Sequence, residues 1–278
     1  MNQAEHFKKL NDYFTKSRLG YDLFLEGAKH FGYYPKNKKI SEKEAQILMQ
    51  DLIGEKLNLK KSMKVLDAGC GQGVVSTYLA KKFDCHIDGI TMINFEIGIA
   101  NKLAERMNVS NNINYSLMDY SNTEFDNETF DAIYTIETLC HSTNIRKTLK
   151  EFYRVLKKGG KVALFEYRFA DDYQFSNYEM ELVNIIINAT ASPSLRELRY
   201  NKFKKIVEEA GFKNVKEQNI TENFEPSLKR LKVFAYVPYL FVKIFELQKY
   251  FPNATIAVEI HRAVEKGLVK YFILTAEK

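Results

Sequence analysis

The fold of this chain is indicated by one short stretch, Val65-Leu66-Asp67-Ala68-Gly69-Cys70-Gly71-Gln72-Gly73. A short apolar run ends in an acidic residue, and glycines follow at every second position. Glycine permits a tight turn and lets the backbone approach a ligand closely. Val74 stands where a dinucleotide-binding loop would have its third glycine, and no Gly-Lys-Ser/Thr follows, which excludes a P-loop. Asp67 suits a ligand that carries an ammonium group, although a lone glycine loop also fits a generic strand-to-helix turn.

Short apolar runs alternate with helical stretches on both sides of this loop. Strands are expected at 63–68, 86–91, 112–119, 130–137, 161–167, 213–220 and 268–276. The intervening helices are expected at 74–83, 94–107, 143–160 and 195–212, with Gly159 and Gly160 ending the third and Ser194 and Glu197 forming a capping box before the fourth. This alternation predicts an α/β fold with a doubly wound, mostly parallel sheet of seven strands.

The rest of the chain extends this core into a single domain, 1–278. Residues 1–60 are expected to form a helical lid, with a capping box at Ser41 and Glu44. A core at 61–167 is followed by an acceptor helix and the sixth strand at 168–221. A helical cap at 222–265, in which Pro226 is expected to begin a helix, precedes the last strand at 266–278.

Composition excludes several classes of protein. The 278 residues are 45% hydrophobic and 27% charged, which excludes wholesale disorder, and the net charge of +6 is spread too thinly for a nucleic-acid binder. Three cysteines without metal-ligand or disulfide spacing favour a reducing cytoplasm. No group of His or carboxylate residues has metal-ligand spacing, so no metal site is predicted. The most apolar stretch, 233–245, is too short to span a bilayer.

Residues 61–167 resemble the core of class I S-adenosylmethionine-dependent methyltransferases. The glycine loop matches the first motif of that family, while FDAIYTIE and FYRVLKKGGKVALFEY match its fourth strand and the following helix, glycine pair and strand. The resemblance implies S-adenosylmethionine as cofactor and a Rossmann-like sheet. It also implies the cofactor contacts, which are Asp67, Gly69, Gly71 and Gly73 at the amino-acid end and Asp119, beside Tyr120, at the adenine.

One position departs from the common family pattern. The second strand usually ends in an acidic residue that binds the ribose hydroxyls, and here Thr91 ends it. Sterol and isoprenoid methyltransferases often lack that acid as well. Thr91, Asn94 and Glu96 are expected to replace it, while the alternative for Glu96 is a solvated charge on a helix surface.

Two further segments resemble sterol side-chain methyltransferases and related isoprenoid enzymes. Residues 136–141, Ile-Glu-Thr-Leu-Cys-His, resemble their Ile-Glu and Cys-His pattern. Residues 21–34 resemble the aromatic segment that closes over the cofactor in those enzymes, and Gly27 and Gly32 among its aromatic residues suggest a lid. His30 and Tyr34 are therefore candidate catalytic residues and Tyr33 a cofactor contact, because aromatic faces attract cations. The alternative is an ordinary aromatic core.

Glu137 and His141 follow the fourth strand, where cofactor and acceptor are expected to meet. Histidine accepts a proton near neutral pH, and a carboxyl group holds one in an apolar pocket, so both are candidate acid–base residues. The alternative for His141 is a helix-capping role.

The segment 222–265 is rich in aromatic residues and is expected to cover a lipophilic acceptor together with 178–187. A homodimer interface is one alternative. Peripheral membrane contact is another, because Lys229, Arg230 and Lys232 lie beside the apolar run. The first expectation for function is C-methylation of a sterol-like or isoprenoid molecule. O-methylation of a small natural product and a non-catalytic module that binds cofactor or lipid are the alternatives.

Overall fold

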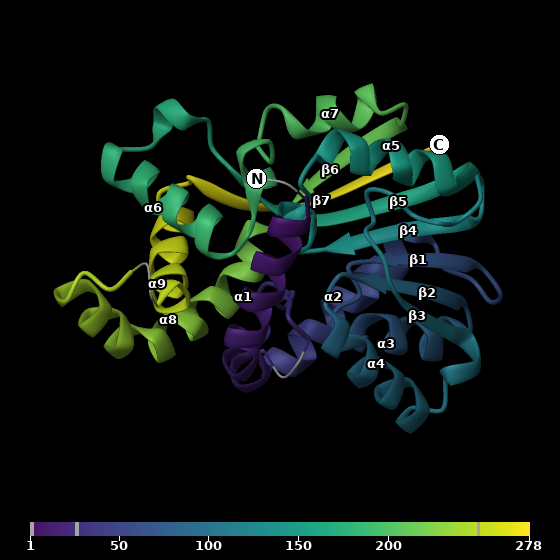
Figure 1. Ribbon diagram of the computed structural model, residues 1–278, viewed down its shortest axis with the longest axis horizontal. Helices are drawn as coiled ribbons and strands as arrows, with labels where there is room; N and C mark the ends of the chain where they lie inside the picture. The colour runs from purple at the N-terminus through teal and green to yellow at the C-terminus, as the bar shows by residue number, and fades with distance from the viewer. Residues whose placement is uncertain (1–2, 26–27, 249–250) are drawn as a thin grey trace.

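A seven-stranded sheet forms the centre of the molecule in the computed structural model, which describes residues 3–25, 28–248 and 251–278 (Figure 1). The strand order is β3-β2-β1-β4-β5-β7-β6. The strands β1 to β5 pair in parallel, whereas β7 pairs antiparallel with both β5 and β6. Their bounds are β1 Lys64–Ala68, β2 His86–Thr91, β3 Ile113–Leu117, β4 Phe130–Ile136, β5 Leu156–Phe169, β6 Lys213–Asn219 and β7 Val269–Glu277. The predicted fold class is confirmed.

Helices cover both faces of the sheet, and a second group gathers beyond the carboxyl ends of its parallel strands. Figure 1 shows α5 and α7 on one face and α2, α3 and α4 on the other, while α1, α6, α8 and α9 lie beside the strand ends. Of the segment 1–60 that is predicted as a lid, α2 packs against the sheet, whereas α1 lies beside the strand ends. The bounds are α1 Gln3–Phe24, α2 Glu42–Leu57, α3 Val74–Phe83, α4 Asn94–Arg106, α5 Ile145–Val155, α6 Asn177–Ala189, α7 Phe203–Glu209, α8 Thr221–Ile244 and α9 Pro252–Glu265.

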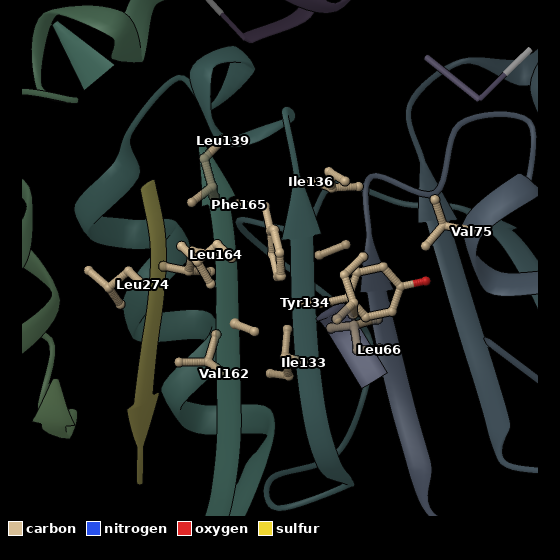
Figure 2. Packing of buried hydrophobic residues seen from close by; sticks show 14 of the residues in the cluster. Leu66, Val75, Ile133, Tyr134, Ile136, Leu139, Val162, Leu164, Phe165 and Leu274 are labelled. Carbon is tan, nitrogen blue, oxygen red and sulfur yellow. The ribbon is translucent and has the colours of Figure 1, made fainter. Parts of the chain in front are cut away.

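The core lies between these layers. Leu66 of β1, Ile133 of β4 and Val162 of β5 stand opposite one another in register, as Figure 2 shows, and all three are fully buried. Leu274 of β7 continues this buried apolar layer. Burial of such side chains, at about 25 cal/mol per Å² of apolar area, is the main force that holds the helices to the sheet.

The helix expected at 143–160 is wrong at its carboxyl end. It ends at Val155, and β5 already begins at Leu156, which is fully buried opposite Phe130. The register then jumps to Lys161 opposite Ala132, so the glycine pair forms an irregularity within the strand and does not end the helix.

The helix expected at 195–212 is also wrong, because only α7 forms there, after a short 3-10 turn at Pro193–Arg196. The expected capping box is absent, since the Ser194 hydroxyl donates to the Ser142 carbonyl at 2.7 Å. The backbone around Arg199 instead pairs with the end of β5, because the Phe169 amide donates to the Leu198 carbonyl at 2.9 Å and the Tyr200 amide donates to the Phe169 carbonyl at 3.1 Å. Pro226 does not begin a helix either, because α8 starts at Thr221.

Residues 28–34 are fastened to α2. The capping box of Ser41 and Glu44 is present, as predicted. The Tyr33 amide donates to the Ala45 carbonyl at 2.8 Å, and a Cβ atom on Gly32 would lie 2.5 Å from the Ala45 Cβ. Gly32 therefore serves close packing and not a hinge, while Gly27 lies outside the described residues.

We expect Gly32→Ala to destabilise the protein by about 1–3 kcal/mol, because the added methyl group overpacks the contact with α2. The matched control is Gly98→Ala in α4, where a Cβ atom would meet nothing within 4 Å. Alanine is there the better helix former by about 1 kcal/mol, so this variant should gain stability. Urea unfolding measures both, and equal free energies of unfolding for the two variants would contradict the close contact.

Candidate functional site

One cavity of about 570 Å³ runs from the carboxyl ends of β1, β2 and β4 to the helices α1, α6, α8 and α9. Its first half is polar and is formed by the glycine loop and the neighbouring strand ends. Its second half is mostly apolar and is formed by the helices. Parallel α/β sheets bind their ligands at this edge, so the cavity lies where a ligand is expected.

Asp67 lies at the sheet end of the cavity, where its side chain is only 2% exposed. Its Oδ2 has no hydrogen-bond partner among the described residues. Burial raises the pKa of this carboxyl to about 7. An ammonium group bound here would supply the missing partner and bring that pKa down.

Two of the three loop glycines border the same space. A Cβ atom on Gly69, whose φ is +101°, would lie 2.2 Å from Thr138 Oγ1, so no larger residue fits there. Gly71 also lines the cavity, and its nearest side-chain atom is Glu96 Oε1 at 3.9 Å from a built Cβ. Gly73 does not line it, but lets α3 approach Tyr115, whose hydroxyl oxygen lies 2.5 Å from the built Cβ.

Thr91 and Glu96 meet at the place expected for the ribose contacts. The Thr91 hydroxyl donates to Glu96 Oε2 at 2.7 Å, and the Lys29 ammonium donates to Glu96 Oε1 at 2.6 Å. Glu96 is only 2% exposed, so it is not a solvated surface charge. Lys29 also lies 4.8 Å from the centre of the Phe14 ring. Asn94 begins α4 but does not line the cavity.

Asp119 and Tyr120 form the other side of the polar half. Asp119 accepts from the Ser121 amide at 2.8 Å and from Gln3 Nε2 of α1 at 2.5 Å. The Tyr120 hydroxyl donates to the Thr138 carbonyl at 3.0 Å. Helix α1 thus lies directly over the end of the cavity expected for adenine.

Glu137 follows β4 and lines the middle of the cavity with a φ of +54°. Its Oε1 accepts from the Phe31 amide at 2.9 Å and from the Tyr271 hydroxyl at 3.1 Å. Burial raises the pKa of Glu137 to about 8, and the nearby carboxylate of Glu166 adds to the rise. These contacts fix the carboxyl group between the segment 28–34 and β7.

His141 stands beside Glu137 in the lining. Its Nδ1 lies 3.1 Å from the Ala191 carbonyl oxygen, which can only accept, so Nδ1 carries the proton and Nε2 keeps its lone pair. Burial lowers the pKa of His141 to about 4. The ring is therefore neutral at pH 7 and able to accept a proton at Nε2.

Besides Gly73 and Asn94, the three predicted residues of the segment 28–34 do not line the cavity. His30 is buried between Gln50, whose Nε2 lies 3.1 Å from the ring Nε2, and the Phe31 carbonyl. The Tyr34 hydroxyl donates to Glu42 of α2 at 3.0 Å, and Tyr33 packs against the core. The structure therefore does not bring them together with Glu137 and His141; they fasten residues 28–34 to the core.

Sequence reasoning missed several residues of the site. Lys29 lines the cavity and contacts Glu96, and Tyr271 contacts Glu137 from behind the lining, but nothing in the local pattern marks a single lysine in a loop or one tyrosine in a strand. Tyr13 and Phe14 of α1 line the cavity too, and their signal was an aromatic pair in an amphipathic helix.

The acceptor half of the cavity is enclosed by the helices expected to form the cap. The side chains that line it are mostly aliphatic and aromatic, and include Phe169, Phe175, Leu182, Ile186, Leu231 and Ile260. Figure 1 shows that α6, α8 and α9 come together beside α1. Within residues 3–25, 28–248 and 251–278, no three metal-ligating side chains cluster, and no helix has the length and apolar character needed to cross a bilayer.

Comparison with known proteins identifies the family of this chain. Residues 2–233 match the family model for mycolic acid cyclopropane synthetase. An S-adenosyl-L-methionine-dependent Diels-Alderase of Talaromyces variabilis is 30% identical over 85% of this chain and 83% of its own length. The sterol 24-C-methyltransferase of Candida albicans is 31% identical over 64% of this chain. The match covers 49% of that enzyme, so the chain aligns with about half of this relative.

Solved structures share the fold. The cyclopropane synthase MmaA2 of Mycobacterium tuberculosis superimposes with a TM-score of 0.83 and 17% identity over 98% of both chains. The [4+2]-cyclase SpnF gives a TM-score of 0.77 and 20% identity over 96% of this chain and 95% of its own. With a family model that covers most of its length, the chain belongs to the mycolic acid cyclopropane synthetase family of S-adenosylmethionine-dependent methyltransferases.

Proposed function

We propose that this enzyme transfers a methyl group from S-adenosylmethionine to a carbon atom of a sterol-like or isoprenoid acceptor. The observation that carries the proposal is the single cavity in which Glu137 and His141 lie between a polar cofactor half and an apolar half. The sterol 24-C-methyltransferase relatives support this class of acceptor.

The residues of the polar half fit the cofactor by chemistry. Asp67 would hold the ammonium group of its amino-acid end, with Gly69 and Gly71 giving the backbone room to approach. Glu96 and Thr91 would take the ribose hydroxyls, and Asp119 the adenine. When bound, the cofactor supplies an activated methyl group on a sulfonium.

The chain's own residues then position the acceptor and stabilise the positive charge that develops on it. Methylation of an acceptor alkene by that group would form the new bond at one alkene carbon and leave a cation on the other. The Glu137 carboxylate stabilises that positive charge. Nε2 of His141 takes the proton whose loss restores a double bond, and α1 keeps water out of the reacting space.

The cofactor assignment predicts a loss of binding in Asp67→Asn. Removing a hydrogen bond to a charged group costs about 1.5–3 kcal/mol, so the affinity for S-adenosylhomocysteine should fall about 10- to 100-fold. Calorimetry measures this directly. The matched control is Asp88→Asn, because Asp88 pairs with Lys64 away from the cavity. Equal affinity in the Asp67 variant and the wild type would refute the assignment.

The chemistry predicts a pH dependence. Glu137 acts as a carboxylate, and its pKa is raised to about 8, so kcat/KM for the acceptor, measured at saturating cofactor so that Asp67 is ionised, should rise with pH through about 8 and level off above it. His141, with a pKa lowered to about 4, is already neutral and adds no inflection near pH 6.5. Glu137→Gln should abolish the rise. The assay follows labelled methyl groups into a panel of sterol and isoprenoid alkenes.

His141→Ala should lower turnover by about 10²–10⁴-fold while cofactor affinity stays nearly intact. The control is His86→Ala, since His86 is exposed at the start of β2. Wild-type turnover in both the Glu137 and His141 variants would show that the protein only positions its substrates, which favours an acceptor that is already nucleophilic, such as an oxygen.

A second use of the same cavity is cyclisation without methyl transfer, which the Diels-Alderase relative favours. The two functions differ in one measurement, because a cyclase leaves S-adenosylmethionine unconsumed while its product forms. O-methylation consumes the cofactor but gives an ether. A non-catalytic module would convert no acceptor at all.

We further propose a cytoplasmic protein that contacts a membrane through α8. Large apolar side chains that include Val237, Phe241 and Ile244 are 61–71% exposed on this helix. Phe234 and Pro238 of the same helix line the cavity, so a lipid could pass from this surface to the acceptor half. Exposed Lys229 and Lys243 supply positive charge for anionic headgroups.

The double variant Val237→Glu/Phe241→Glu should reduce co-sedimentation with phosphatidylcholine–phosphatidylserine vesicles by at least about tenfold, since each buried apolar side chain contributes about 1.5–3 kcal/mol. Ile47→Glu is the matched control, because Ile47 is a partly exposed apolar residue on α2. Wild-type protein that does not co-sediment with vesicles, but forms a dimer as its concentration rises, would contradict membrane contact and favour a homodimer through the same face.

A further inference from the structure

The acceptor half of the cavity is mostly apolar, but one part of its wall is charged. Glu259 and Arg262 of α9 both line it. Arg262 Nη1 lies 2.7 Å from Glu259 Oε1 and 3.0 Å from the Tyr239 hydroxyl oxygen, and that hydroxyl donates to Glu259. Tyr178 of α6 also lines the cavity, and its pKa is raised by burial and by the charge of Glu259. We name Tyr178, Tyr239, Glu259 and Arg262 the distal cluster.

The distal cluster is buried at Glu259 and Tyr239, whereas Arg262 and Tyr178 lie at its rim, 39% and 51% exposed. Glu179 and Lys266 lie 2.6 Å apart, but the Lys266 side chain is 62% exposed, so water and salt screen that pair. The Glu259 side chain is only 10% exposed, and Tyr239 is almost fully buried. Three helices of the cap, α6, α8 and α9, supply the distal cluster, whereas Glu137 follows β4.

The distal cluster suits a neutral polar group. A carboxylate would be attracted by Arg262 but repelled by Glu259. An ammonium group would be attracted by Glu259 but repelled by Arg262. A hydroxyl group satisfies both charges, because it donates to the carboxylate and accepts from the guanidinium. The Tyr239 hydroxyl already does this. Within the described part of the chain, Glu259 Oε2 makes no hydrogen bond and can accept one from a ligand.

We propose that the distal cluster binds a hydroxyl group at the end of the acceptor remote from the methylated carbon. The acceptor is thereby an amphipathic alcohol, with an apolar body held along α6 and α9 and its reacting bond beside Glu137 and His141. The proposal rests on the lipophilic acceptor proposed above, and it adds the polar group that sets the orientation of that acceptor.

The test uses three probes of one chain length: decan-1-ol, its methyl ether and decanoate. The ether accepts a hydrogen bond but cannot donate one to Glu259. Calorimetry on the wild-type protein should show decan-1-ol binding about tenfold more tightly than the ether, which is the worth of a hydrogen bond to a charged group. Decanoate should bind more weakly than the alcohol.

Glu259→Gln keeps the side-chain shape but removes the charge, so the preference for the alcohol over the ether should fall to about twofold. The matched control is Glu265→Gln on the same helix, because Glu265 is half-exposed and does not line the cavity. The readout is the ratio of the affinities for the alcohol and the ether. If Glu259 only joined α8 to α9, its substitution would weaken the binding of both probes equally.

Equal affinities of the wild type for alcohol and ether, tighter binding of decanoate, or no binding of any probe would each overturn the proposal. The same holds if Glu265→Gln lowers the preference as much as Glu259→Gln does. The measurement needs no turnover. A wild type that prefers the alcohol but methylates no acceptor would therefore refute the proposed function and leave the distal cluster intact.

Discussion

Desolvation at the carboxyl edge of the sheet governs the charged groups of the site. The same burial raises the pKa of Asp67 to about 7 and that of Glu137 to about 8, and it lowers the pKa of His141 to about 4. Each shift favours the neutral form of the group. These shifts reduce the charge that the three groups carry near pH 7, and a cationic ligand is the species that restores the ionised form of Asp67.

Helix α1 maintains that desolvation. Its residues cover the polar half through the Gln3 contact with Asp119 and the middle of the cavity through the His6 ring, whose Nε2 lies 2.9 Å from the His141 carbonyl oxygen. The ring of Phe14 packs edge-on against His141 with a centroid separation of 5.3 Å. Without α1, water would reach Glu137 and His141, and the pKa values of both would return toward their ordinary range.

The sheet and the polar half of the site could be predicted from the sequence because they depend on local signals. Strand periodicity and the glycine loop placed Asp67 and Glu137 at one edge, and parallel topology brings such strand ends together. The predicted helix bounds were wrong where long-range contacts set them, as with the backbone bridge between Phe169 and Arg199 and with Leu156 opposite Phe130. The position of His30 was predicted wrongly for the same reason, because a segment rich in aromatic residues has the same sequence pattern whether it faces a ligand or a neighbouring helix.

Helix α1 makes hydrogen bonds to both halves of the cavity. Gln3 reaches Asp119 on the cofactor side, and Tyr13 donates to Asn253 of α9 on the acceptor side at 3.3 Å. A displacement of this one helix therefore uncovers both halves at once. Because Tyr13 and Phe14 of α1 also line the cavity, a bound acceptor that packs against this helix holds it over the cofactor half, so exchange of the cofactor is expected to slow while the acceptor half is filled.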